Sequence, residues 1–158
     1  MGIRYYAYPI TAEQYPSAVE NPCLFHGSDP LMDAWGPVEE QPEMLYLDKC
    51  WHELQVLLGP QSGVADRPAL QLVEGRVTDV GMGWIAYECA LSPAQVQAVA
   101  ADLATVGESD IRRLLPALNR WNDSVDKQFE YIAHYLGAAQ EFTAVLAKDG
   151  RGLVYLIG

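Results

Sequence analysis

The sequence predicts a single α/β domain in which a small mixed sheet is sandwiched between helices. Three observations indicate this. Segments with strand and helix character follow one another as strand, helices, strand, helices, strand. The first and last of them, residues 2–10 and 152–158, are apolar on both faces, so each needs cover on both sides. The chain has 158 residues, of which 50% are hydrophobic and 20% charged, which suits one well-filled core.

Residues 2–10 are rich in tyrosine and isoleucine and predict the first strand. Thr11 and Gln14 have the spacing of a capping box, which predicts a short helix to about residue 20. Residues 21–42 contain many prolines and glycines, so we expect a loop there with one turn of helix over 29–35. A loop of this length is typical of a functional segment or of one packed over the core.

Residues 44–59, MLYLDKCWHELQVLLG, carry the clearest helix pattern in the chain. Apolar residues recur there at helical spacing, namely Leu47, Trp51, Leu54, Leu57 and Leu58. Asp48 is expected to cap the first turn, and Gly59 followed by Pro60 is expected to end the helix. We therefore predict a three-turn helix that buries Trp51 as its largest apolar side chain.

The second half of the chain predicts a strand over 84–91 and then a helix opened by the capping box of Ser92 and Gln95. Residues 68–75 fit a strand and a short helix equally well. Ser109 is expected to cap a short helix that Pro116 stops. A long helix from about 123 to 147 follows, in which Gly137 is expected to mark a bend or a close helix contact. Residues 152–158 predict a fully buried last strand.

The net charge is −11, which argues against nucleic acid and anionic membranes as partners, because both require a basic surface. The charge is also uneven. Residues 28–53 hold seven acids against one lysine, a net charge of −6. Such a segment favours a basic protein or a cationic small molecule as partner.

Three cysteines, an odd and sparse set, suit a reducing cytoplasm. The N-terminal residues lack the apolar core of a signal peptide, and no apolar run approaches membrane-spanning length. Cys23 and His26, together with Cys50 and His52, could supply four zinc ligands. Their spacing is poor, since Cys50 and His52 would point to different faces of a helix, so we expect no metal and no cofactor.

Three segments together resemble a known family. They are residues 1–10, residues 45–59 and the ending KDGRGLVYLIG, and the second contains an LDK-x-W-x-x-L pattern formed by Leu47, Asp48, Lys49, Trp51 and Leu54. In these segments the chain resembles the YfbM-like family of small bacterial proteins over essentially its whole length. The resemblance implies one layered α/β domain over residues 1–158. It implies no activity and no site residue, because the family is itself a domain of unknown function.

Two functional hypotheses follow from the residues. The first is a non-catalytic binding module whose acidic and aromatic side chains meet a cationic partner. Its candidate binding residues are Asp29, Asp33, Trp35, Glu39, Glu40, Glu43 and Tyr46. The alternative is a small-molecule enzyme in which Asp48 orients His52 four residues later on one helix, with Glu53 or Glu88 nearby. Binding is favoured, because the chain contains no recognisable catalytic motif.

Overall fold

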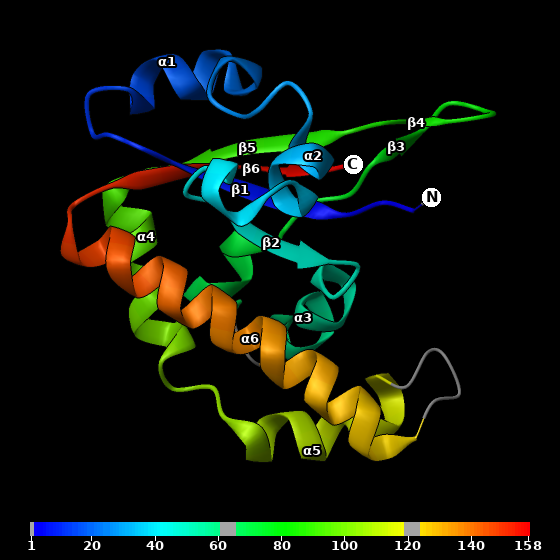
Figure 1. The fold of residues 1–158 in the computed structure, drawn as a ribbon. Coiled ribbons are helices and arrows are strands. Elements are labelled where there is room, and N and C mark those ends of the chain that lie inside the picture. The colour runs from blue at the N-terminus through cyan, green and yellow to red at the C-terminus, as the bar shows by residue number, and fades with distance from the viewer. Residues whose placement is uncertain (1, 61–65, 119–123) are drawn as a thin grey trace.

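The computed structural model describes residues 2–60, 66–118 and 124–158. Its main sheet has four strands in the order β2-β1-β6-β5, and every pairing between them is antiparallel (Figure 1). The strands are β1 (Tyr5–Ile10), β2 (Leu45–Asp48), β5 (Tyr87–Leu91) and β6 (Gly152–Ile157). The predicted class, with helices and a small sheet in one domain, is thus confirmed, but the sheet is antiparallel rather than mixed. The first and last strands lie side by side at its centre.

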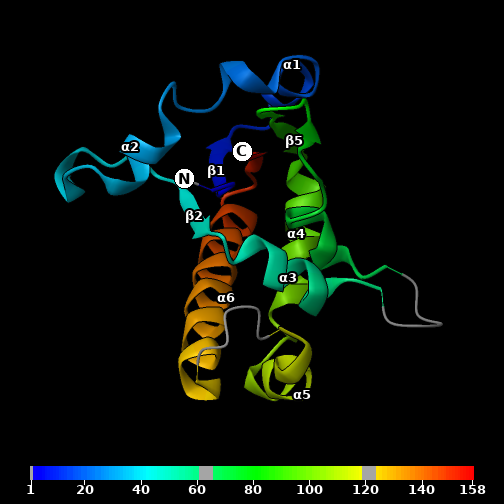
Figure 2. The ribbon, with the colours of Figure 1, turned by 90° about the vertical axis from the view of Figure 1, so that its right-hand side faces the viewer.

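Helices cover both faces of the sheet (Figures 1 and 2). One face shares the main hydrophobic core with α3 (Trp51–Leu58), α4 (Pro93–Leu103) and α6 (Val125–Lys148), and α5 (Glu108–Leu118) packs against α3 and α6. The other face is covered by α1 (Tyr15–Glu20) and α2 (Pro30–Trp35). None of the helices within the described ranges combines the length and apolar character needed to cross a membrane.

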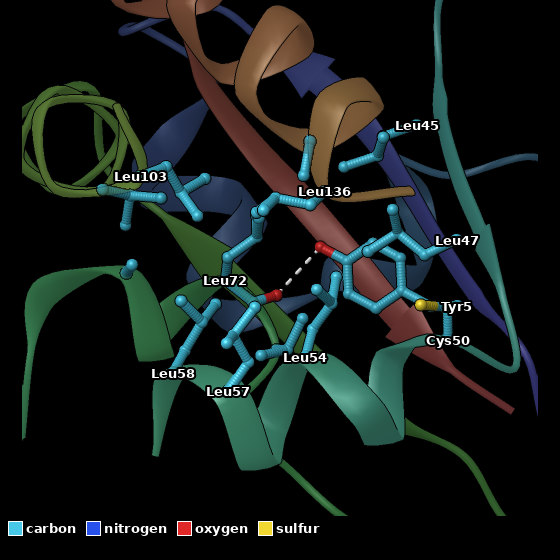
Figure 3. Close-up of a cluster of buried hydrophobic side chains, with 14 of the residues drawn as sticks. Tyr5, Leu45, Leu47, Cys50, Leu54, Leu57, Leu58, Leu72, Leu103 and Leu136 are labelled. Atoms are coloured by element: carbon cyan, nitrogen blue, oxygen red, sulfur yellow. Dashed lines mark hydrogen bonds between the residues drawn. The ribbon is translucent and has the colours of Figure 1, made fainter. Parts of the chain in front are cut away.

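Alternation along β1 explains why both faces need cover. Tyr5 and Ala7 point into the main core, whereas Tyr6 and Tyr8 pack with residues of α2 on the opposite face. Tyr5 is fully buried among the leucines of the main core, and its hydroxyl donates a hydrogen bond of 2.9 Å to the carbonyl oxygen of Leu72 (Figure 3). This bond satisfies the polar tip of a side chain whose ring is in an apolar environment.

Several local predictions are confirmed. In the capping box of α4, the Gln95 amide donates to the Ser92 hydroxyl at 3.1 Å, and the Ser92 amide donates to the Gln95 side chain at 2.8 Å. Thr11 and Gln14 form the same reciprocal bonds, although α1 itself begins one residue later. The helical turn predicted over 29–35, the long helix and the buried last strand are all present.

The prediction for residues 44–59 is wrong before Trp51. Residues Leu45–Asp48 form β2, and the helix begins only at Trp51. Leu45 and Leu47 alternate into the core from a strand, and Leu47 stands at a helical spacing from Trp51 by coincidence. Asp48 therefore does not cap α3. Trp51 is only partly buried, and its indole N–H donates to the carbonyl oxygen of Ile3 at 3.2 Å.

Two further boundaries differ from prediction, and one open choice is settled. Residues 84–91 form two strands, of which β4 (Trp84–Ile85) pairs with β3 (Thr78–Asp79) in a protruding hairpin, while β5 joins the main sheet (Figure 1). Helix α5 runs from Glu108 to Leu118, so Ser109 lies inside its first turn and does not cap it, and Pro116 lies inside its last turn and does not stop it. The short 3₁₀ helices are η1 (Pro22–Leu24), η2 (Val38–Glu40) and η3 (Pro68–Leu72), the last of which settles the open choice for residues 68–75.

Gly137 does not mark a close helix contact, because a Cβ atom placed there would meet nothing within 4 Å. Gly137→Ala should therefore raise the free energy of unfolding by about 1 kcal/mol through helix propensity, measured by urea denaturation. Gly152→Ala is the matched control, since its Cβ would press on the main-chain oxygen of Leu91 and should cost about 1–3 kcal/mol. A loss of stability in Gly137→Ala would show that α6 is packed at this position.

Candidate functional site

Asp48 is the last residue of β2 and has a φ of 48°, the left-handed conformation. Among the described residues, it is the one non-glycine residue with a positive φ. Aspartate tolerates this conformation better than most residues do. The conformation turns the chain from β2 toward α3 and places the Asp48 carboxylate beside α6.

The Asp48 carboxylate accepts three hydrogen bonds from three different parts of the fold. Arg4 Nε donates at 3.1 Å from the approach to β1, the Tyr46 hydroxyl at 3.0 Å from β2, and the Tyr131 hydroxyl at 3.0 Å from α6. The Asp48 side chain remains 25% exposed. One carboxylate thus joins the sheet to the long helix at the edge of the molecule.

Aromatic rings surround this carboxylate. The Tyr46 ring lies 5.5 Å from that of Tyr6 and 6.4 Å from that of Tyr135, while Tyr131 and Tyr135 are 5.1 Å apart in an edge-on arrangement. The Arg4 guanidinium is 5.3 Å from the centroid of Trp35, which is 60% exposed. We name this group the Tyr46 cluster, and it comprises Arg4, Trp35, Tyr46, Asp48, Tyr131 and Tyr135.

The phenols that bind Asp48 are held in their neutral form. Burial, together with the hydrogen bond to Asp48 and its negative charge, raises the pKa of Tyr46 to about 12. Burial also raises the pKa of Tyr131, and the Asp48 charge adds to this shift. Both hydroxyls therefore act as hydrogen-bond donors at neutral pH, and neither is poised to be a base.

A groove of about 330 Å³ lies between β2 and α6, at the lower end of the range for ligand pockets. We call it the β2–α6 groove. It is lined by Glu43, Met44, Leu45, Tyr46, Ala138, Glu141, Phe142 and Val145. Tyr46 belongs both to this groove and to the Tyr46 cluster, so the two features form one acidic and aromatic surface.

The predicted binding residues divide into two groups. Trp35, Glu43 and Tyr46 contribute to this surface. Glu43 also accepts two hydrogen bonds from Arg151, at 2.7 and 2.8 Å, and these bonds lower the pKa of the Glu43 carboxyl. Asp29 instead caps α2, and Asp33 accepts a 2.7 Å bond from the Tyr8 hydroxyl, which fastens α2 to the sheet. Glu39 and Glu40 are exposed on η2.

The structure contradicts one premise of the catalytic alternative. Asp48 belongs to β2 and His52 to α3, so the predicted placement of both on one helical face is wrong. Glu53 points inward and is 1% exposed. Cys23 is exposed and Cys50 is buried, and the described residues contain no group of three or more His, Cys, Asp or Glu side chains arranged to hold a metal ion.

Five residues of this surface were not predicted from the sequence, namely Arg4 and, on α6, Tyr131, Tyr135, Glu141 and Phe142. A signal for the two tyrosines was present, because a spacing of four residues places them on one helical face. The signal for Arg4 was weaker. It is one basic residue just before an apolar strand, and its partner lies 44 positions away.

Residues 1–156 match the model of a family described as "Domain of unknown function (DUF1877)". The chain is also similar in structure to a protein of unknown function, YfbM, from Escherichia coli. That similarity covers 99% of each chain with a TM-score of 0.55 and 16% sequence identity, and at this identity it shows the fold alone. No curated protein matches the sequence.

Asp48→Ala should lower the free energy of unfolding by about 2–4 kcal/mol. The change leaves three donors without their acceptor and puts alanine in a left-handed conformation. Asp48→Asn keeps an acceptor oxygen and the tolerance for this conformation, so it should cost less than half as much. Urea denaturation measures both variants, and equal losses would show that neither the backbone conformation nor the remaining acceptor matters.

Tyr46 should make folding stability depend on alkaline pH. The pKa of Tyr46 is about 12 in the folded protein and about 10 in the unfolded chain, because the folded state favours the neutral phenol. The contribution of Tyr46 to the free energy of unfolding is therefore fully present below pH 10 and is lost as the pH rises toward 12. Tyr46→Phe should therefore flatten the decline of the urea midpoint between pH 10 and 11.5. An unchanged slope in this variant would show that Tyr46 titrates at the same pH in both states.

Proposed function

Because the chain belongs to the DUF1877 family, whose function is unknown, we propose a function from geometry alone. We propose that this protein is a non-catalytic binding module that takes a cationic partner on the surface formed by the β2–α6 groove and the Tyr46 cluster. The observation that carries the proposal is the meeting of aromatic rings and carboxylates at Tyr46. A basic segment of a protein is the partner that this surface fits best.

The chemistry of the surface supports a cationic partner. Aromatic faces and carboxylates attract ammonium and guanidinium groups, and the chain already seats its own Arg4 over the ring of Trp35. Apolar wall residues such as Phe142 and Val145 suit the methylene stem of a lysine or arginine. The groove thus offers carboxylates and apolar wall residues together.

The overall charge supports the same partner. A net charge of −11 produces a field that accelerates the approach of a basic protein and repels nucleic acid. Such attraction is screened by salt, with a Debye length of about 10 Å at 0.1 M ionic strength. Affinity that falls with salt is therefore a defining property of the proposed interaction.

The enzyme hypothesis has less support. The Asp48 carboxylate already accepts bonds from an arginine and two neutral phenols, so it is engaged in holding the fold together.

We also place the protein in the cytoplasm, where free thiols persist, and its three cysteines are free.

Binding of octalysine, measured by calorimetry at low and high salt, tests the proposal. We expect the wild type to bind at low salt and to weaken about tenfold or more near 0.3 M salt. The variant Glu43→Gln with Glu141→Gln should weaken binding at low salt. Glu13→Gln with Glu20→Gln, at exposed positions on and just before α1, makes the same charge change as a control and should have little effect.

Equal weakening by the groove and control variants would overturn the assignment of the site, because only the net charge would then matter. A second outcome would favour the enzyme hypothesis. That outcome is a small molecule that co-purifies with the wild-type protein in stoichiometric amount. Its binding would be insensitive to salt and would be lost in the His52→Ala variant.

A further inference from the structure

The register of the sheet shows which main-chain groups of β2 face outward. Arg4 and Gly158 exchange two backbone hydrogen bonds, of 3.0 and 2.9 Å, so they form a hydrogen-bonded pair between the ends of β1 and β6. Such pairs recur at every second residue in an antiparallel ladder. The backbone groups of Tyr6 and Tyr8 therefore face β6, and those of Tyr5 and Ala7 face β2.

The same alternation continues into β2. Ala7 is paired with Leu45, so the N–H and C=O groups of Leu45 face β1. The N–H and C=O groups of the next residue, Tyr46, then point away from β1 toward the open side of the sheet. Within the described part of the chain, no hydrogen bond outside the sheet pairing uses these two groups of Tyr46.

This open edge lies beside the β2–α6 groove. The groove is lined on one side by Leu45 and Tyr46 and on the other by Phe142 and Val145 of α6. Strand β2 lies close to the C-terminal half of α6 (Figure 2). A strand placed along β2 would send alternate side chains toward the groove and toward the opposite face, where the Tyr46 ring packs.

We propose that the partner is an extended basic segment of another protein that adds to β2 as a fifth strand, an inference that rests on the proposed function. The backbone of the segment would bond to the outward N–H and C=O of Tyr46, and its basic side chains would face Glu141 and, beside its partner Arg151, Glu43. A second copy of this chain fits poorly, because two molecules with a charge of −11 repel each other.

The experiment uses an alternating Lys-Val heptapeptide and a version of it N-methylated at every second residue. N-methylation removes the N–H groups on one edge of the peptide and keeps its charge. We expect calorimetry to show at least about a tenfold loss of affinity for the methylated peptide, the equivalent of 1.4 kcal/mol. The amide of Tyr46 should also exchange with solvent more slowly when the unmodified peptide is bound.

Two protein variants test the hydrogen bond that the outward N–H of Tyr46 would donate to the peptide. Tyr46→Pro removes the outward N–H, which an edge strand tolerates, and Tyr46→Ala removes the ring but keeps the N–H. Tyr46→Pro should bind the unmodified peptide several-fold more weakly than Tyr46→Ala. If Tyr46→Pro does not fold, as judged by circular dichroism, the methylated peptide on the wild type decides the question.

Two outcomes separate this inference from the proposed function. Equal affinity for both peptides, with salt sensitivity retained, would overturn strand addition and leave the cationic binding site standing. An absence of binding by both peptides and by octalysine at low salt would overturn the proposed function and the strand addition with it.

Discussion

The Asp48 carboxylate is the junction on which this end of the fold depends. Its three donors come from the approach to β1, from β2 and from α6, elements that are far apart in the sequence. Hydrogen bonds to a charged acceptor are worth more than neutral ones, and loss of the acceptor would leave partly buried donors unpaired. The left-handed backbone at Asp48 is held by these bonds, and the position of β2 against α6 follows from it.

Much of the fold could be predicted from the sequence, because its signals are local. The capping box of Ser92 and Gln95 and the apolar positions of α6 act within a few residues, and the structure shows both. The strand β2 could not be predicted in this way. Its four residues alternate toward the core, but Leu47 also fits the helical stripe that continues to Leu58, and only pairing with β1 decides between the two.

The site was less predictable than the fold. Net charge along the sequence suggested that five acids, Asp29, Asp33, Glu39, Glu40 and Glu43, share one binding surface, but the role of an acid depends on its nearest donor in space. Asp33 accepts a hydrogen bond from the Tyr8 hydroxyl, and Asp29 caps the first turn of α2. Glu43, in contrast, lines the groove. Tyr46 was identified from its neighbours in sequence. The helix that completes its surroundings begins 79 positions later, at Val125, so the groove itself could not be foreseen.

The two outer strands of the sheet, β5 and β2, have different neighbours. Over β5, η1 and α1 pack against the outer face of the sheet, and His26 Nε2 on the loop after η1 lies 2.7 Å from a Glu88 carboxylate oxygen, a contact that fastens this loop to β5. At the β2 edge, the main-chain groups of Tyr46 face outward beside a groove. Proteins commonly blunt exposed edges with proline, lysine or a covering segment, because an open edge invites pairing. The four residues of β2 include neither proline nor lysine, so the open edge is a feature of the fold that a binding role would explain.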